Sequence, residues 1–214
     1  MSDFVNTIDL LGDDVVARQL LDGSITEFKD DVVTHVSPPY FRNCANLTVI
    51  DMPNLIDITN PYDNRHFANN PLLTTVNLPK LQKVSQYMII NNASLEKIVL
   101  PSVKKVMGAP LMDNKSLRIV DFPVVENIYD RSFEDDAVLT ALILRSETMA
   151  TLDSTGAFTR SAIASGTGYI YVPRALVDTY KTATNWSTFA NQFRALEDYT
   201  VDGTVTGELD ESKI

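Results

Sequence analysis

The chain has 214 residues, of which 44% are hydrophobic, and a formal net charge of −10. No stretch approaches the roughly 20 apolar residues that span a bilayer, and the first residues lack the pattern of a secretion signal, so we expect no membrane insertion. The ends are acidic: residues 1–40 contain eight acidic and two basic residues, and residues 197–214 contain six and one. Nucleic acid is therefore not an expected partner, because it attracts basic surfaces. The single cysteine, Cys44, excludes an internal disulfide framework.

The amino-terminal region, residues 1–40, is predicted to cap the structure that follows. Residues 12–23, GDDVVARQLLDG, begin with acidic residues, carry apolar residues at helical spacing and end in glycine, which predicts a short amphipathic helix. Residues 24–36, SITEFKDDVVTHV, align with later repeats but have Asp31 where those repeats have proline. We expect a helix and a degenerate repeat with a polar outer face.

Residues 41–146 contain a repeat of the form L-x-x-(V/I/L)-x-(L/M/F)-P. Its first leucine recurs after 26, 22, 22 and 22 residues, at Leu47, Leu73, Leu95, Leu117 and Leu139. Apolar residues follow each leucine by three and five positions, and in the first four units also by eight and eleven. One unit buries too few apolar side chains to offset the entropy lost on ordering it. Stacked units share their apolar faces and pair their backbones, so the repeat predicts a solenoid.

Two further positions of the repeat predict where the chain turns. Proline has no amide hydrogen to donate to a neighbouring strand, so four prolines are expected to end the first strand of their units: Pro53, Pro79, Pro101 and Pro123. Four positions before each leucine stands a residue suited to a turn: Asn43, Asn69, Asn91, Asp113 and Asp135. In the fifth unit Arg145 replaces the proline and the second apolar pair is missing, which predicts that the array ends near residue 146.

Residues 147–199 are predicted to form a second cap. A loop rich in small residues leads to a strand at residues 169–173, and residues 174–183 and 185–196 have the pattern of two short helices. Their apolar side chains are expected to cover the open end of the last repeat: Val177, Tyr180, Trp186, Phe189, Phe193 and Leu196. Residues 200–214 are acidic, with low apolar content and no helical period, so we predict a flexible tail.

The predicted fold is a β-dominated leucine-rich repeat solenoid of about five 22-residue coils and a degenerate first unit, with a helical amino-terminal cap and a mixed α/β carboxy-terminal cap. The unit FRNCANLTVIDMP, residues 41–53, resembles BspA-type leucine-rich repeats, and the resemblance covers roughly residues 19–196. Residues 168–199 also resemble the cap that follows such repeats in proteins of anaerobic bacteria and of their phages and prophages. The chain departs from the family pattern in keeping the cysteine only once and in mostly lacking the glycine and the Ala-Phe pair after the second strand.

The resemblance implies a binding or structural protein without enzymatic activity. Related proteins are mostly surface adhesins or virion-associated components that recognise a host. Because this sequence shows no secretion signal, membrane span or wall anchor, we expect a phage virion component made in the host cytoplasm that takes part in host-surface or glycan recognition. A bacterial cell-surface or secreted adhesin is the alternative. The expected partners are a host surface protein or glycan, other virion proteins or a second copy of the chain.

Outward positions of the first strands form an extended face that is a candidate binding surface. Its polar members include Thr48, Asp51, Thr74, Asn77, Lys97, Arg118 and Asp121. Solenoids commonly bind ligands through such a face, and the alternative is a solvated sheet surface.

Lysines of the repeat form a second candidate. Lys83 and Lys105 occupy equivalent positions in adjacent units, and Lys104 lies in the neighbouring row. With Lys80, Lys97 and Arg118 they are predicted to form one basic cluster, suited to an acidic glycan or to the acidic end of a neighbouring subunit. The alternative is a solvated row partly neutralised by Glu96 and Glu126.

The sequence contains no pattern typical of catalysis. The only histidines, His35 and His66, fall in the cap unit and in an insertion of the first repeat, so a paired histidine site is not expected. The glycine-containing stretches lack the spacing of a phosphate-binding loop or a calcium loop. We expect no enzyme, cofactor or metal site.

Overall fold

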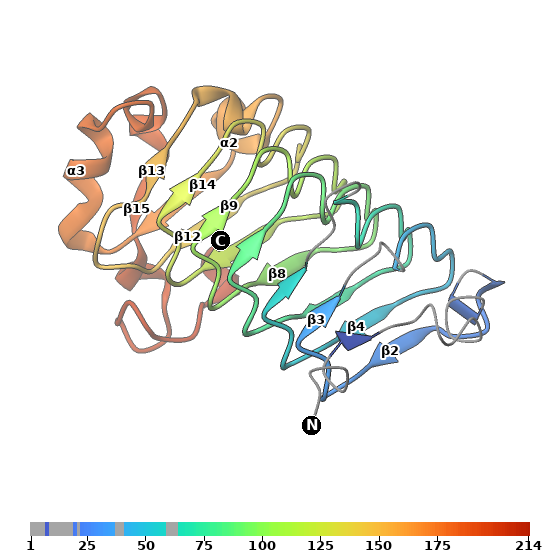
Figure 1. Cartoon of the computed structure of the whole chain (residues 1–214). Coiled ribbons are helices and arrows are strands. Elements are labelled where there is room, and N and C mark those ends of the chain that lie inside the picture. Colours follow the sequence, from blue (N-terminus) through green and yellow to red (C-terminus); the bar gives the residue numbers. More distant parts are fainter. Residues whose placement is uncertain (1–6, 9–18, 21, 37–40, 59–63) are drawn as a thin grey trace.

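The computed structural model describes residues 7–8, 19–20, 22–36, 41–58 and 64–214. The chain winds into stacked coils that progress along one axis from the amino-terminal end to a helical carboxy-terminal cap (Figure 1). Each coil has a strand on a first side, a corner, and a shorter strand on a second side. Most of the helix predicted at residues 12–23 lies outside the described residues.

Parallel strands from successive coils pair to form the two sides. The first side contains β2 (Glu27–Lys29), β4 (Val49–Asp51), β6 (Thr75–Asn77), β8 (Lys97–Val99), β10 (Ile119–Phe122), β12 (Ala141–Leu144), β14 (Tyr169–Val172) and β15 (Phe193–Ala195). The second side contains β1 (Thr7–Ile8), β3 (His35–Val36), β5 (Asp57–Ile58), β7 (Lys83–Val84), β9 (Lys105–Val106), β11 (Asn127–Ile128) and β13 (Thr151–Leu152). Each side divides into two sheets whose neighbouring strands are one coil apart. This arrangement confirms the predicted β-rich solenoid.

The repeated apolar positions form a continuous core between the two sides. All five leucines that define the repeat are fully buried, and so are Leu78, Leu100 and Val106 at later positions of the unit. They belong to one cluster that runs from Leu20 to Phe193. The strands β4, β6 and β8 end before their prolines, as the missing amide hydrogen predicts.

The predicted turn residues have a left-handed backbone. The φ angles are 61° at Asn43, 60° at Asn69, 57° at Asn91, 65° at Asp113 and 64° at Asp135. Asparagine and aspartate tolerate this region better than other residues with a Cβ atom, which explains why they recur here.

A ladder of buried asparagines, which the sequence analysis missed, stands one residue further along. The Asn92 Nδ2 donates to the Phe67 carbonyl at 2.8 Å, and its Oδ1 accepts from the Asn70 amide at 3.0 Å. The other rungs make the same bonds: Asn70 reaches Phe41 and Cys44, and Asn114 reaches Ile89 and Asn92. Because a buried backbone group without a partner is costly, the ladder stabilises the turns of successive coils.

The carboxy-terminal cap continues the solenoid beyond the predicted end of the array. The second side gains β13 after residue 146, and β14 and β15 extend the first side. Between and after them lie the 3-10 helices η2 (Thr155–Phe158), η3 (Arg174–Leu176), η4 (Trp186–Gln192) and η5 (Leu196–Tyr199) and the α-helices α2 (Ala162–Ser165) and α3 (Val177–Thr182). Tyr180, Trp186, Phe189 and Phe193 pack into the core at this end. The described residues contain no helix that is both long and apolar enough to cross a membrane.

The final segment differs from the predicted flexible tail. Residues 199–210 form a hairpin in which Thr200 bridges Leu209, and the short 3-10 helix η6 (Glu211–Lys213) follows. Leu209, Val205 and Ile214 pack on the outer face of the first side, against Ile119 and Ile143. Figure 1 accordingly shows the carboxy terminus beside the middle strands rather than at the end of the solenoid. Few apolar residues are enough to order this segment, because they pack against an apolar surface that the strands of the first side already form.

Candidate binding surfaces

The amino-terminal half of the predicted outer face is open and contains a shallow depression. Four predicted residues line this depression of about 630 Å³: Asp51, Thr74, Asn77 and Lys97. Thr48 lies beside them and donates its hydroxyl to the Thr26 carbonyl at 2.8 Å. The structure therefore brings these predicted residues together on neighbouring strands.

The polar groups of this depression are largely engaged within the chain. The Asn77 Nδ2 donates to the Asp51 Oδ1 at 2.7 Å, and Lys97 forms an ion pair with Glu211 of the carboxy-terminal segment. The Lys29 Nζ lies 2.7 Å from the Glu27 carboxylate, which raises the pKa of the lysine. The depression thus offers a nearly neutral surface.

The carboxy-terminal half of the predicted face is covered, so the prediction was wrong for Asp121. The hairpin buries Ile119, Ala141 and Ile143, which the repeat pattern places outward, and leaves Asp121 only 6% exposed. Burial raises the pKa of Asp121, and the hydrogen bonds and charge of Arg145 oppose that rise. Asp121 therefore holds Arg145 and is not available to an external ligand.

The predicted basic cluster divides between the two sides of the solenoid. Lys97 in β8 and Arg118, just before β10, belong to the first side, whereas Lys83 and Lys105 begin β7 and β9 on the second. Arg118 lies 3.4 Å from Glu96, and Lys104 lies 2.9 Å from Glu126. These ion pairs agree with the alternative interpretation, in which Glu96 and Glu126 partly neutralise the row. The prediction of a single cluster was wrong, because the chain turns at the corner of each coil and the stretches before and after the corner belong to different sheets.

Lys83 and Lys105 remain as a pair of exposed cations. They are direct partners in the register of β7 and β9, as their repeat positions predict. Neither forms an ion pair within the described part of the chain. Paired residues of neighbouring parallel strands lie about 4.8 Å apart, so the two lysines stand in a row with like charges close together.

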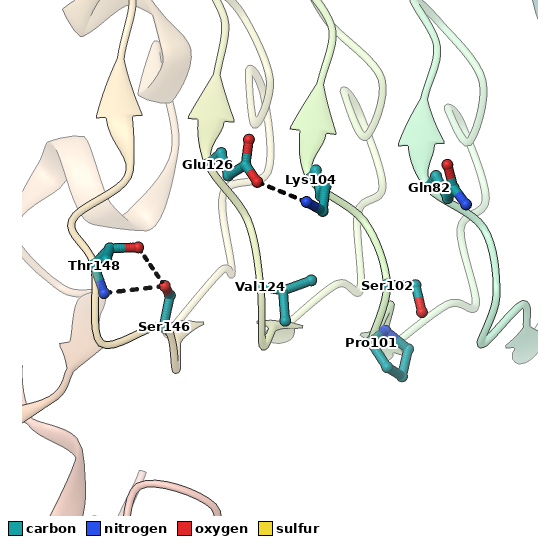
Figure 2. Close-up of a pocket in the computed structure, with 8 residues that line it drawn as sticks. All are labelled: Gln82, Pro101, Ser102, Lys104, Val124, Glu126, Ser146 and Thr148. Atoms are coloured by element: carbon teal, nitrogen blue, oxygen red, sulfur yellow. Dashed lines mark hydrogen bonds and ion pairs between the residues drawn. The ribbon is translucent and has the colours of Figure 1, made fainter.

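A groove runs along the corner between the two sides, and we call it the corner groove (Figure 2). Its volume is about 680 Å³, and its lining comes from four successive coils: Gln82, Pro101, Ser102, Lys104, Val124, Glu126, Ser146 and Thr148. Figure 2 shows Gln82, Lys104 and Glu126 as one row beside the strand starts, with Ser146 and Thr148 at one end. Gln82 and Lys104 directly precede Lys83 and Lys105 in the sequence.

The corner groove also contains hydroxyl groups. The Ser146 Oγ lies 2.9 Å from the Thr148 Oγ1, and the Ser102 Oγ donates to the Pro79 carbonyl at 2.7 Å. Lys104 was predicted from the sequence, whereas these hydroxyl residues were not. The serine that follows Pro101 was a signal in the sequence, since Ser102 and Val124, the residues after Pro101 and Pro123, both line the groove.

The described residues contain no cluster suited to metal binding. No group of three or more histidine, cysteine, aspartate or glutamate side chains in that part of the chain is placed so that it could hold a metal ion. His35 is exposed in β3, whereas His66 is buried. Cys44 is buried as well, and burial raises the pKa of its thiol to about 11.

The family model described as "BspA type Leucine rich repeat region" matches residues 24–162 in six copies. The chain belongs to the BspA-type leucine-rich repeat family. Repeats of the BspA type are typically protein-binding domains without enzymatic activity, so a binding or adhesion role fits this chain and no enzyme family is indicated. Comparison with curated proteins and with solved structures finds no significant match.

Proposed function

We propose that this BspA-type repeat protein is a virion component that recognises an acidic glycan on a host surface. The glycan lies along the corner groove and reaches the lysine pair Lys83 and Lys105. The observation that carries the proposal is this pair: two exposed cations in direct register, without an acidic partner in the described residues, in a chain with a net charge of −10.

The charges of the other surfaces favour this location. On the outer face Lys29 and Lys97 are already paired with Glu27 and Glu211. Lys83 and Lys105 instead repel one another, and a bound carboxylate or sulfate group would relieve that repulsion. An acidic ligand gains more binding free energy at a site whose positive charges have no acidic partner.

The shape of the corner groove suits an elongated ligand. Its lining repeats from coil to coil along the solenoid axis, and it combines hydroxyl groups with the exposed pair Lys104 and Glu126. A linear polymer with repeating polar groups can contact several coils in the same way, and repeated weak contacts add to a useful avidity.

The proposal is tested by removing the lysine pair without changing the fold. Lys83→Gln with Lys105→Gln should weaken binding to dextran sulfate about tenfold at low salt, because electrostatic attraction to the pair is lost. A control with the same change of charge is Lys181→Gln with Lys213→Gln, in the cap and the final segment, and it should bind as the wild type does. Neutral dextran should bind neither variant. Equal binding by the two double variants would contradict the proposed site.

The proposed virion setting rests on the resemblance of residues 168–199 to caps in proteins of anaerobic bacteria and of their phages and prophages. It can be tested separately, by labelling purified particles of the parent phage with an antibody against this chain. Label on the particles is the expected result. Label confined to the bacterial cell surface would favour the adhesin instead, while leaving the glycan site intact.

A further inference from the structure

The last rung of the buried ladder is an acid. Asp136 occupies the repeat position held by Asn70, Asn92 and Asn114 in the preceding coils, and like them it has no exposed surface. Its Oδ1 accepts a hydrogen bond from the Asn114 amide at 2.9 Å, so this oxygen acts as the amide oxygens of the other rungs do.

The second oxygen of Asp136 stands where the other rungs have a donor. Asn114 uses its Nδ2 to reach two carbonyl oxygens, those of Ile89 in the coil before and Leu111 in its own turn. The repeat places the carbonyls of Leu111 and Phe133 in the equivalent positions around Asp136. The Asp136 Oδ2 is buried and has no hydrogen-bond partner. A carboxylate oxygen and a carbonyl oxygen both only accept hydrogen bonds. An ionised Asp136 therefore could not form the hydrogen bond to a carbonyl that completes the other rungs.

We propose that Asp136 is a neutral carboxylic acid in the folded protein and that its Oδ2 proton completes the ladder by donating to a backbone carbonyl. A carboxylic acid offers one acceptor and one donor, which is the same pair of functions that the asparagines supply. The ladder is therefore chemically continuous over four rungs, and its final bond depends on pH.

The charged groups around Asp136 are consistent with a bound proton. Asp113 and Asp135 both disfavour a further negative charge, and Lys115 favours it. Lys115 is itself paired with Asp113, and Asp135 is paired with Arg160. Burial is the largest cause that raises the pKa of Asp136 well above its usual value.

A raised pKa in the folded state makes stability depend on pH with a defined sign. The folded protein holds a proton that the unfolded chain releases, so folding is favoured most below the ordinary pKa of about 3.9. That contribution is lost as pH rises through the folded pKa. Between the ordinary pKa and the raised pKa of the folded state, the ratio of folded to unfolded protein falls about tenfold for each pH unit.

The substitution Asp136→Asn separates this effect from other titrations, because it supplies a permanent donor. Denaturant unfolding of the full chain should show the variant and the wild type with similar midpoints near pH 4 and a higher midpoint for the variant at pH 8. The neighbouring substitution Asp135→Asn is the control with the opposite sign: its ion pair with Arg160 lowers the pKa of Asp135, so its loss should destabilise at pH 8, and the effect should fade only as pH falls below the ordinary pKa of about 3.9.

A direct measurement on the wild type avoids reliance on any variant. The carbon-13 signal of the Asp136 carboxyl group should stay at the position of a protonated acid between pH 4 and pH 6, whereas that of Asp135 should be ionised. A signal typical of a carboxylate at pH 6, or an Asp136→Asn variant whose advantage does not change with pH, would overturn the proposal.

Discussion

Arg145 holds Asp121 in a buried ion pair beneath the carboxy-terminal hairpin. The Arg145 Nε lies 3.0 Å and 2.9 Å from the two carboxylate oxygens, and its Nη2 lies 2.8 Å from the Oδ2. The Nη1 donates to the carbonyls of Val205 and Gly207 at 2.6 Å and 2.9 Å. One arginine, at the position where earlier repeats have proline, therefore joins the sheet to the segment that covers it.

Replacement of this arginine should release the hairpin. We expect Arg145→Met to lower the free energy of unfolding by about 3 kcal/mol, because it leaves the buried Asp121 without a counter-charge. Amide hydrogen exchange of residues 200–214 should rise, and the exposed face of Ile119 and Ile143 should bind a hydrophobic dye.

The far end of the same segment supplies the control for that experiment. Lys97→Met removes an ion pair with Glu211 whose side chains are both 45% exposed. Exposed pairs contribute about 0–1 kcal/mol, so this variant should keep its hairpin protected from exchange. Similar losses of exchange protection in Arg145→Met and Lys97→Met would show that Arg145 has no special role in holding the hairpin.

Removal of a middle rung should weaken the ladder. Asn92→Ala leaves the Phe67 carbonyl and the Asn70 amide without their buried partners, and each loss costs about 1–3 kcal/mol. We expect the denaturant midpoint to fall correspondingly. Asn191→Ala, at an exposed position in the cap, should change stability by less than about 0.5 kcal/mol. A loss at Asn92 no larger than at Asn191 would contradict the role of the ladder.

The buried thiol of Cys44 should be unreactive in the folded protein. With a pKa of about 11 the thiol is almost entirely protonated at pH 8, and the thiolate is the reactive form. A thiol reagent should therefore modify the native chain far more slowly than the chain unfolded in urea. Equal rates at pH 8 would show that Cys44 is accessible or ionised.

The regular part of this structure could be predicted because burial imposes a period on the sequence. Leu73 to Leu139 recur every 22 residues, Leu47 stands 26 residues earlier, all five lie in the core, and the prolines mark the corners. The ladder was visible in the same alignment, as an asparagine three positions before each of three leucines, but only the turn residue beside it was predicted. Cys44 and Asp136 at its ends obscured the pattern.

Features that depend on distant partners could not be predicted in this way. Phe189, Phe193 and Leu196 have helical spacing, yet residues 193–195 form β15 because β14 offers an open edge for pairing. The hairpin likewise depends on an apolar surface formed by three separate coils, and nothing within residues 200–214 reveals it. The lysines were predicted in the correct register, but their division between two sides required the geometry of the corner.

The location of the ligand is tested most directly by hydrogen exchange of the full chain with dextran sulfate, compared with neutral dextran. We expect protection at residues 82–84, 104–106 and 126–128, at the strand starts beside the corner groove, and no change in β4, β6 and β8. Protection confined to β4, β6 and β8 would place the ligand on the outer face and contradict the proposed glycan site.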